Sequence, residues 1–284
     1  MLSVLTVNIG AASPERARLL LDWLARRPEQ VLVITETSAG PGTAWLLDRF
    51  RRAGFTVIKT PDADGERGSA LVSRVRVARD LTAEFAAVSI PCRVSAALLG
   101  AEPAISVIGV YVPSRDRSAD KTGRKQRFIR TLVGACDKLP QDLREHLVLG
   151  GDYNVIGRTH RPMHPGFLPF EFGLLEGLRE RGLVDAYEHV APEDQAYSWI
   201  GRTGDGYRYD YLHVGPGLAG LIGTCSYLHE TRQLSLTDHA AMTLTLHADA
   251  TPLETGNPRR HRNGHRRHTH PVLGAHRWAR TSES

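Results

Sequence analysis

Cysteine is scarce in this sequence. The 284 residues contain only Cys92, Cys136 and Cys225. These residues lie far apart, are odd in number and show no CxxC spacing, so the sequence indicates neither a disulfide framework nor a zinc cluster. Unpaired cysteines are typical of proteins in reducing compartments, and we therefore expect the protein in the cytoplasm.

A long apolar run is also lacking. The first ten residues, MLSVLTVNIG, are apolar, but they carry no basic leader and are too short to span a bilayer. They predict a first β-strand and not a signal peptide. We expect no membrane partner.

Residues 1–250 have no excess of either charge. Seven of the 36 lysines and arginines lie beyond residue 250, against two of the 31 acidic residues, so this tail carries the whole net charge of +5. Residues 251–284 are rich in Arg, His, Gly and Pro and poor in periodic apolar residues, which predicts a disordered tail. The tail is either a solvated terminus or a non-specific polyanion-binding arm.

Residues 1–250 form one predicted α/β domain, because no linker rich in Pro, Gly or Ser interrupts them. About ten strands are too many for one small open sheet, so we expect two packed mixed β-sheets flanked by helices. Periodicity predicts strands at 3–8, 31–35, 55–59, 69–73, 94–99, 104–112, 146–149, 208–214, 224–229 and 241–246, and helices at 14–27, 43–53, 121–136 and 171–181.

Polar side chains follow several of these strands at the point where each strand ends. Each one alone has an ordinary explanation; GGDYNV (150–155), for example, contains typical turn residues. Together they predict a site rich in carboxylates, with one imidazole and no serine in a GxSxG elbow. Oxygen ligands of this kind suit Mg²⁺ or Mn²⁺. The residues concerned are Asn8, Glu36, Tyr111, Asp152, Asn154, Asp210, Asp238 and His239.

Nine short motifs occur in order across residues 1–250. They are VNIG (7–10), ITET (34–37), GSALVSR (68–74), VYVPS (110–114), GGDYNV (150–155), GLVDAY (182–187), YSW (197–199), RYDYL (208–212) and LTDHA (236–240). In this order they resemble the exonuclease/endonuclease/phosphatase superfamily, above all its exonuclease III-like abasic-site endonucleases. The resemblance implies a four-layer α/β sandwich that hydrolyses phosphodiesters or phosphomonoesters with a divalent metal.

The resemblance also implies roles for the polar residues. Glu36, with Asn8 and Asp238, would hold Mg²⁺ or Mn²⁺. Asp152 would orient or deprotonate the attacking water, and Asn154 would position Asp152 and the phosphate. A carboxylate cluster repels a phosphodiester unless a cation intervenes, so the metal both admits the substrate and stabilises the transition state.

The remaining catalytic candidates are Tyr111, Asp210 and His239. The resemblance implies that Tyr111 and His239 face the phosphate oxygens and that Asp210 supports His239. A neighbouring carboxylate favours the charged imidazole, which donates hydrogen bonds to phosphate. The alternative is a purely structural histidine.

Two stretches favour DNA as the partner. Trp199, Tyr207 and Tyr209 match positions that line the pocket for an extruded base-free sugar in the abasic-site branch. Residues 114–130 hold seven basic and two acidic side chains, which predicts either a strip that follows phosphates or a solvated helix face. The candidate phosphate contacts are Arg115, Arg117, Lys121 and Arg124.

The sequence departs from the family pattern at three positions. Gly10 stands where an acidic residue is frequent, Ser38 follows the second motif where a lysine is frequent, and Tyr209 is bulkier than the usual aliphatic residue. These departures leave open a phosphatase or phosphodiesterase for a small or lipid-linked phosphoester. A non-catalytic nucleic-acid-binding module is a further alternative. We expect a monomer.

Overall fold

Two six-stranded sheets form the centre of the fold, which a computed structural model describes for residues 1–63 and 65–260. The first sheet has the order β14 (Ile222–Leu228), β15 (Ala241–Leu246), β1 (Leu2–Asn8), β2 (Val31–Thr37), β4 (Gly68–Ser73) and β3 (Thr56–Ile58). The second has the order β10 (Val184–Asp185), β13 (Asp210–Val214), β9 (Leu147–Asp152), β8 (Ile105–Tyr111), β6 (Val94–Leu99) and β5 (Val77–Asp80).

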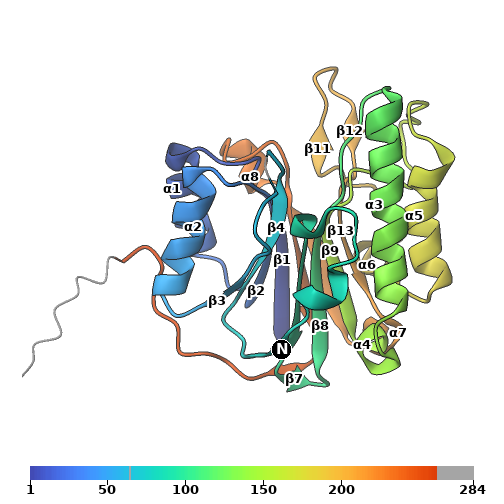
Figure 1. Cartoon of the computed structure of the whole chain (residues 1–284). Helices are drawn as coiled ribbons and strands as arrows, with labels where there is room; N and C mark the ends of the chain where they lie inside the picture. The colour runs from blue at the N-terminus through green and yellow to red at the C-terminus, as the bar shows by residue number, and fades with distance from the viewer. Residues whose placement is uncertain (64, 261–284) are drawn as a thin grey trace, which may run out of the picture.

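Helices cover the outer face of each sheet, as Figure 1 shows. Helices α1 (Pro14–Leu24) and α2 (Pro41–Arg52) lie on the first sheet, and α3 (Ala119–Asp137) and α5 (Pro169–Glu180) on the second. The shorter elements are α4 (Gln141–Glu145), α6 (Ala186–Val190), α7 (Pro216–Ala219), α8 (Glu230–Gln233), two 3₁₀ turns (Thr82–Phe85 and Pro91–Arg93), the pair β11 (Trp199–Ile200) and β12 (Gly206–Tyr207), and the pair β7 (Ala101–Glu102) and β16 (Asp249–Ala250).

Both sheets are mixed. The pairs β1–β2 and β8–β9 are parallel, whereas β1–β15, β2–β4, β9–β13 and β6–β8 are antiparallel. The four-layer α/β sandwich with two packed mixed sheets is therefore confirmed.

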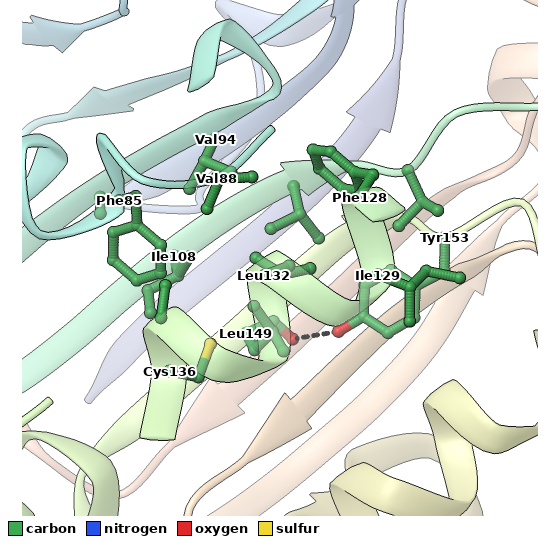
Figure 2. Close-up of a cluster of buried hydrophobic side chains, with 14 of the residues drawn as sticks. Phe85, Val88, Val94, Ile108, Phe128, Ile129, Leu132, Cys136, Leu149 and Tyr153 are labelled. Atoms are coloured by element: carbon green, nitrogen blue, oxygen red, sulfur yellow. Dashed lines mark hydrogen bonds between the residues drawn. The ribbon is translucent and has the colours of Figure 1, made fainter. Parts of the chain in front are cut away.

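Alternating side chains along the central strands divide between two cores. Val4 of β1 packs between the sheets, whereas its neighbour Leu5 packs under the helices of the first sheet. On β9, Val148 packs between the sheets and Leu149 under α3. Figure 2 shows the α3 core, in which Phe128, Leu132 and Cys136 of the helix lie against strand residues such as Ile108. All three cysteines are buried free thiols.

Strand β9 continues through the two glycines to Asp152, whereas the sequence predicted a strand over 146–149. A Cβ on Gly151 would lie 2.0 Å from the Val110 carbonyl oxygen, and the φ of Gly151 is 140°. A Cβ on Gly150 would lie 2.4 Å from the side chain of Leu212. The glycines therefore let neighbouring strands approach closely and do not end the strand.

Residues 251–260 also differ from the sequence prediction, which assigned them to a disordered tail. Pro252 bridges to Val75, and the Arg49 Nε donates to the Pro258 carbonyl at 2.8 Å. Arg259 pairs with Asp22 at 2.8 Å. The domain therefore extends beyond the predicted limit at residue 250. Residues 251–260 lack apolar periodicity, but backbone contacts and arginine side chains hold them against the domain. The rest of the predicted tail, 261–284, lies outside the described residues. None of the helices in the described ranges is long and apolar enough to cross a membrane.

His213 on β13 predicts a pH dependence of stability. Burial lowers its pKa to about 4, against the opposing charge of Asp185. The unfolded chain therefore binds more protons than the folded chain between pH 6.5 and 4. The stability that the neutral His213 ring contributes is thus complete above pH 6.5 and is lost as the pH falls. The slope is up to about 1.4 kcal/mol per pH unit. Urea unfolding at pH 7 and pH 5 should show a smaller loss for His213→Phe than for the unaltered protein; equal losses would contradict the assignment.

Candidate active site

The polar strand ends of both sheets meet in one cleft with a volume of about 630 Å³. Its lining combines acidic and basic side chains with aromatic rings. The lining residues are Glu36, Ser114, Arg115, Asp116, Arg117, Lys125, Asn154, His164, Pro165, Gly166, Phe167, Glu171, Trp199, Tyr207, Tyr209, Asp238 and His239.

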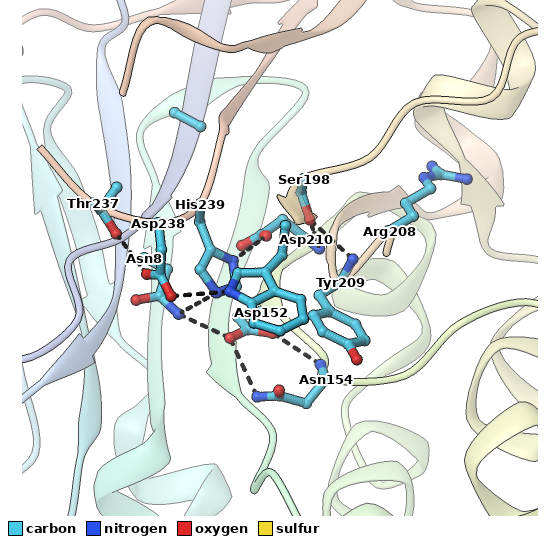
Figure 3. A network of polar contacts seen from close by, with 12 residues as sticks. Asn8, Asp152, Asn154, Ser198, Arg208, Tyr209, Asp210, Thr237, Asp238 and His239 are labelled. Atoms are coloured by element: carbon cyan, nitrogen blue, oxygen red, sulfur yellow. Dashed lines mark hydrogen bonds and ion pairs between the residues drawn. The ribbon is translucent and has the colours of Figure 1, made fainter. Parts of the chain in front are cut away.

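Asp152 lies at the end of β9 and is fully buried beneath this cleft. Its carboxylate accepts hydrogen bonds from Asn8 Nδ2 at 2.9 Å, the Asn154 backbone N–H at 2.9 Å and Asn154 Nδ2 at 3.2 Å (Figure 3). Burial raises the pKa of Asp152 to about 8; the charge of Asp210 acts in the same direction and His239 against it. The carboxylate is therefore fixed in orientation and has raised proton affinity.

Asn154 follows the strand with a φ of 50°. This left-handed turn directs both its backbone N–H and its side-chain amide back to the Asp152 carboxylate. The second part of GGDYNV is therefore a turn, as the simpler interpretation had it, and this turn holds Asp152.

His239 and Asp210 form a buried pair next to Asp152. His239 Nδ1 lies 2.7 Å from Asp210 Oδ2, and Asp210 is opposite Asp152 in the register of β13 and β9. Burial opposes the charged ring, but the charge and hydrogen bond of Asp210 outweigh it and raise the pKa of His239 to about 10. The charged ring has two N–H donors. The 3.4 Å contact of its Nε2 with the amide nitrogen of Asn8 then joins two donors, which leaves the Nε2 proton available to another acceptor.

Glu36 lies at the end of β2 with a φ of 52°. It accepts a hydrogen bond from the Tyr111 hydroxyl at 2.8 Å and a second from Arg67, which the sequence analysis missed. Burial and the charge of Glu36 raise the pKa of Tyr111 far above its usual value, so Tyr111 remains a donor. The sequence predicted a phosphate contact for Tyr111, whereas its hydroxyl here contacts Glu36.

The donor set suits a hard cation with few protein ligands. In residues 1–63 and 65–260 no cluster of three or more His, Cys, Asp or Glu forms a metal cage. The candidates Glu36, Asp238 and Asn8 offer two carboxylates and one amide, and Mg²⁺ often takes only one or two carboxylates and keeps several waters. At Gly10, where an acidic side chain would extend the set, the Arg16 guanidinium donates to the backbone carbonyl at 2.6 Å. The residues fit Mg²⁺ or Mn²⁺ better than zinc.

Trp199, Tyr207 and Tyr209 come together as the aromatic wall of the cleft. Their ring centroids lie 5.2 to 5.8 Å apart. His164 and Phe167 extend this wall, with His164 stacked on Tyr207 at 3.9 Å, and the sequence analysis missed both. The Trp199 indole N–H also donates to Asp238 at 2.9 Å, so the wall is bonded to a metal-ligand candidate.

The predicted basic strip is divided. Arg115 and Arg117 line the cleft, whereas Lys121 pairs with Asp116 at 2.7 Å and Arg124 pairs with Glu66. Lys121 and Arg124 lie on α3, which begins at Ala119, and are outside the lining of this cleft. That all four residues contact phosphate stays a prediction.

Ser198 is a further residue that the sequence analysis did not single out. Its hydroxyl oxygen accepts hydrogen bonds from the backbone N–H groups of Tyr209 and Asp210, at 2.9 and 3.1 Å. Ser198 therefore joins the aromatic wall to the start of β13. Its place in the YSW motif was the only sequence signal for it.

One known protein family has a model that matches most of the chain. Residues 5–217 match the model of the endonuclease/exonuclease/phosphatase family. No curated protein matches the chain.

Solved structures have the same fold. A 3′–5′ exonuclease, NExo, from Neisseria meningitidis is 25% identical, with a TM-score of 0.72 over 86% of this chain and 99% of that one. An AP endonuclease from Archaeoglobus fulgidus is 22% identical, with a TM-score of 0.71 over 87% and 99%. A variant of the 3′ phosphatase NExo from Neisseria, bound to a product DNA hairpin, is 24% identical with the same TM-score and coverage. From the family match over most of its length, the chain belongs to the endonuclease/exonuclease/phosphatase family.

Proposed function

We propose that the chain is a metal-dependent phosphodiesterase that cleaves DNA in the manner of abasic-site repair nucleases. The observation that carries this proposal is the convergence of Asp152, the His239–Asp210 pair and an aromatic wall on one cleft. The 25% identical structure of a 3′–5′ exonuclease supports a nucleic-acid substrate.

Glu36, Asn8 and Asp238 would hold Mg²⁺ or Mn²⁺. When bound, the cation supplies positive charge that offsets the charge of the phosphate and of the surrounding carboxylates. Tyr111 orients Glu36 through its hydroxyl, and Trp199 orients Asp238 through its indole N–H.

Asp152 is the proposed base for the attacking water. Its raised pKa gives it proton affinity near neutral pH, and Asn8 and Asn154 hold its oxygens in place. His239, held by Asp210, donates its Nε2 proton as a hydrogen bond to a phosphate oxygen and stabilises the charge that develops there.

The aromatic wall and Arg117 are the proposed DNA contacts. Stacking on Trp199, Tyr207 and Tyr209 suits an unstacked nucleotide or a base-free sugar. Arg117 lines the cleft and is exposed, so it can meet a backbone phosphate.

A phosphomonoesterase or phosphodiesterase for a small or lipid-linked substrate is the second candidate. The Tyr209 ring stacks on both Trp199 and Tyr207 and lines the cleft, so its bulk takes up space that an extruded sugar would need. This observation favours a smaller phosphoester in the same cleft.

Cleavage of a labelled duplex with one abasic site tests the proposal. We expect a cut on the 5′ side that leaves a 3′ hydroxyl, requires Mg²⁺ and stops with EDTA, because the donor set needs a hard cation. Cleavage should exceed that of the matched intact duplex by more than about tenfold, since a missing base costs little to unstack. The measurement is the initial rate on both duplexes with either Mg²⁺ or EDTA.

Tyr209→Leu separates the two candidates. If Tyr209 narrows the pocket, the variant should gain abasic-site cleavage while hydrolysis of a small generic diester stays constant. A preference for the abasic duplex below about tenfold, with no gain in Tyr209→Leu, would contradict the abasic-site assignment. Cleavage without a metal would contradict the proposed chemistry.

A further inference from the structure

Three charged side chains in the lining of the cleft form a largely buried network. Lys125 of α3 and Glu171 of α5 are each only 1% exposed. Lys125 Nζ donates to Glu171 Oε1 at 2.6 Å, and Glu171 Oε2 accepts from Arg115 Nε at 2.9 Å. The network therefore joins two helices and the loop that follows β8.

Burial makes this network costly. Desolvation of Lys125 outweighs the attraction of Glu171 and lowers the pKa of the lysine, while Arg115 and Lys125 hold the pKa of Glu171 below its usual value in spite of burial. Buried ion pairs often add no more stability than well-packed apolar residues of the same volume. Stability alone therefore explains the buried charges of Lys125 and Glu171 poorly. Their other contacts indicate what else these two side chains do.

Lys125 makes one further contact, and it leads to the candidate base. Its Nζ donates to the backbone carbonyl of Asn154 at 2.6 Å. Asn154 is in a left-handed conformation, and its backbone N–H and side-chain amide both hold Asp152. The Asn154 amide also donates to the Val112 carbonyl at 3.0 Å. Lys125 thus fixes the carbonyl of the residue whose other polar groups fix Asp152.

Glu171 makes the corresponding contacts toward the aromatic wall. Its Oε2 accepts the Leu168 N–H at 2.8 Å, and Arg115 reaches the Gly166 carbonyl at 2.5 Å. Phe167, which extends the wall, lies between these two residues in sequence. The same carboxylate therefore braces the loop of residues 164–168, here called the wall loop, whose His164 and Phe167 extend the aromatic wall.

We propose that Lys125 and Glu171 are positioning residues: they hold Asp152 through Asn154 and brace the wall loop through Arg115 and Leu168. The proposal rests on the proposed function, in which Asp152 is the base. Neither residue exchanges a proton with the substrate. A small displacement of a reacting group costs a large factor in rate, which gives such a brace a measurable effect.

A double-mutant cycle in the full chain tests the proposal. Lys125→Met keeps the length of the side chain and removes its donor. We expect it to lower the single-turnover rate at saturating abasic-site DNA and Mg²⁺ by about 10- to 100-fold, with DNA affinity within about threefold. In an Asp152→Asn background the same change should lower the rate by less than about threefold, because its effect passes through Asp152. Lys138→Met, an exposed lysine at the end of α3, is the matched control and should leave the rate unchanged.

The possible outcomes distinguish a failure of the positioning role from a failure of the proposed function. Equal losses in both backgrounds, or a loss in affinity with an unchanged rate, would overturn the positioning role. An Asp152→Asn variant as active as the unaltered protein would instead overturn the proposed function. If Lys125→Met fails to fold, Glu171→Gln, which keeps the shape of the side chain, goes through the same cycle with the same expectations.

Discussion

Replacement of Asp152 by asparagine is expected to lower the single-turnover rate of DNA cleavage by about 10²- to 10⁴-fold, the range for a positioned proton-transfer group. Asparagine keeps the size of the side chain but cannot take up a proton from water. It also presents an amide N–H₂ to donors that surround the carboxylate, namely Asn8 Nδ2 and the Asn154 N–H. Both effects act on the chemical step, so DNA affinity should change much less than the rate.

Rapid mixing of excess enzyme with labelled DNA measures this step directly. Asp142→Asn, an exposed acid on α4, is the matched control and should cleave at the unaltered rate. A rate for Asp152→Asn within about threefold of the unaltered protein, equivalent to less than about 0.7 kcal/mol of barrier, would exclude Asp152 as the base.

Removal of the His239 imidazole has the second large expected effect. His239→Ala should lower the single-turnover rate by about 10²- to 10³-fold, since it deletes a charged donor beside the phosphate. It also leaves Asp210 as a buried carboxylate without its imidazole partner, and Asp210 Oδ1 already lacks a hydrogen bond. A thermal unfolding curve must therefore accompany the rate measurement.

His247→Ala, an exposed histidine after β15, is the control for this experiment and should behave as the unaltered protein. If His239→Ala folds normally and cleaves DNA at an undiminished rate, the imidazole is structural, which is the alternative that the sequence left open.

The sequence predicted the centre of the site because strand ends obey simple geometry. Asp152 and Asp210 end or begin neighbouring strands, so correct placement of the strands is enough to bring the two carboxylates together. The motif order then identified Glu36 and His239, which lie outside these two strands.

The supporting residues could not be predicted in this way. Lys125 and Glu171 are 46 positions apart, and their contact depends on how α3 packs against α5. The sequence around Lys125 reads as an exposed basic strip, so only the packing shows that this lysine is buried. Strands β11 and β12 have two residues each and are too short to carry a periodic signal.

The position of β1 also bears on the synthesis of the chain. This strand lies between β2, its close neighbour in sequence, and β15, which spans Ala241–Leu246. During synthesis, one edge of β1 thus stays without its partner until β15 has been translated. An apolar strand with an open edge is a template for pairing with other chains. Until β15 is made, the free edge of β1 is therefore open to pairing with other chains.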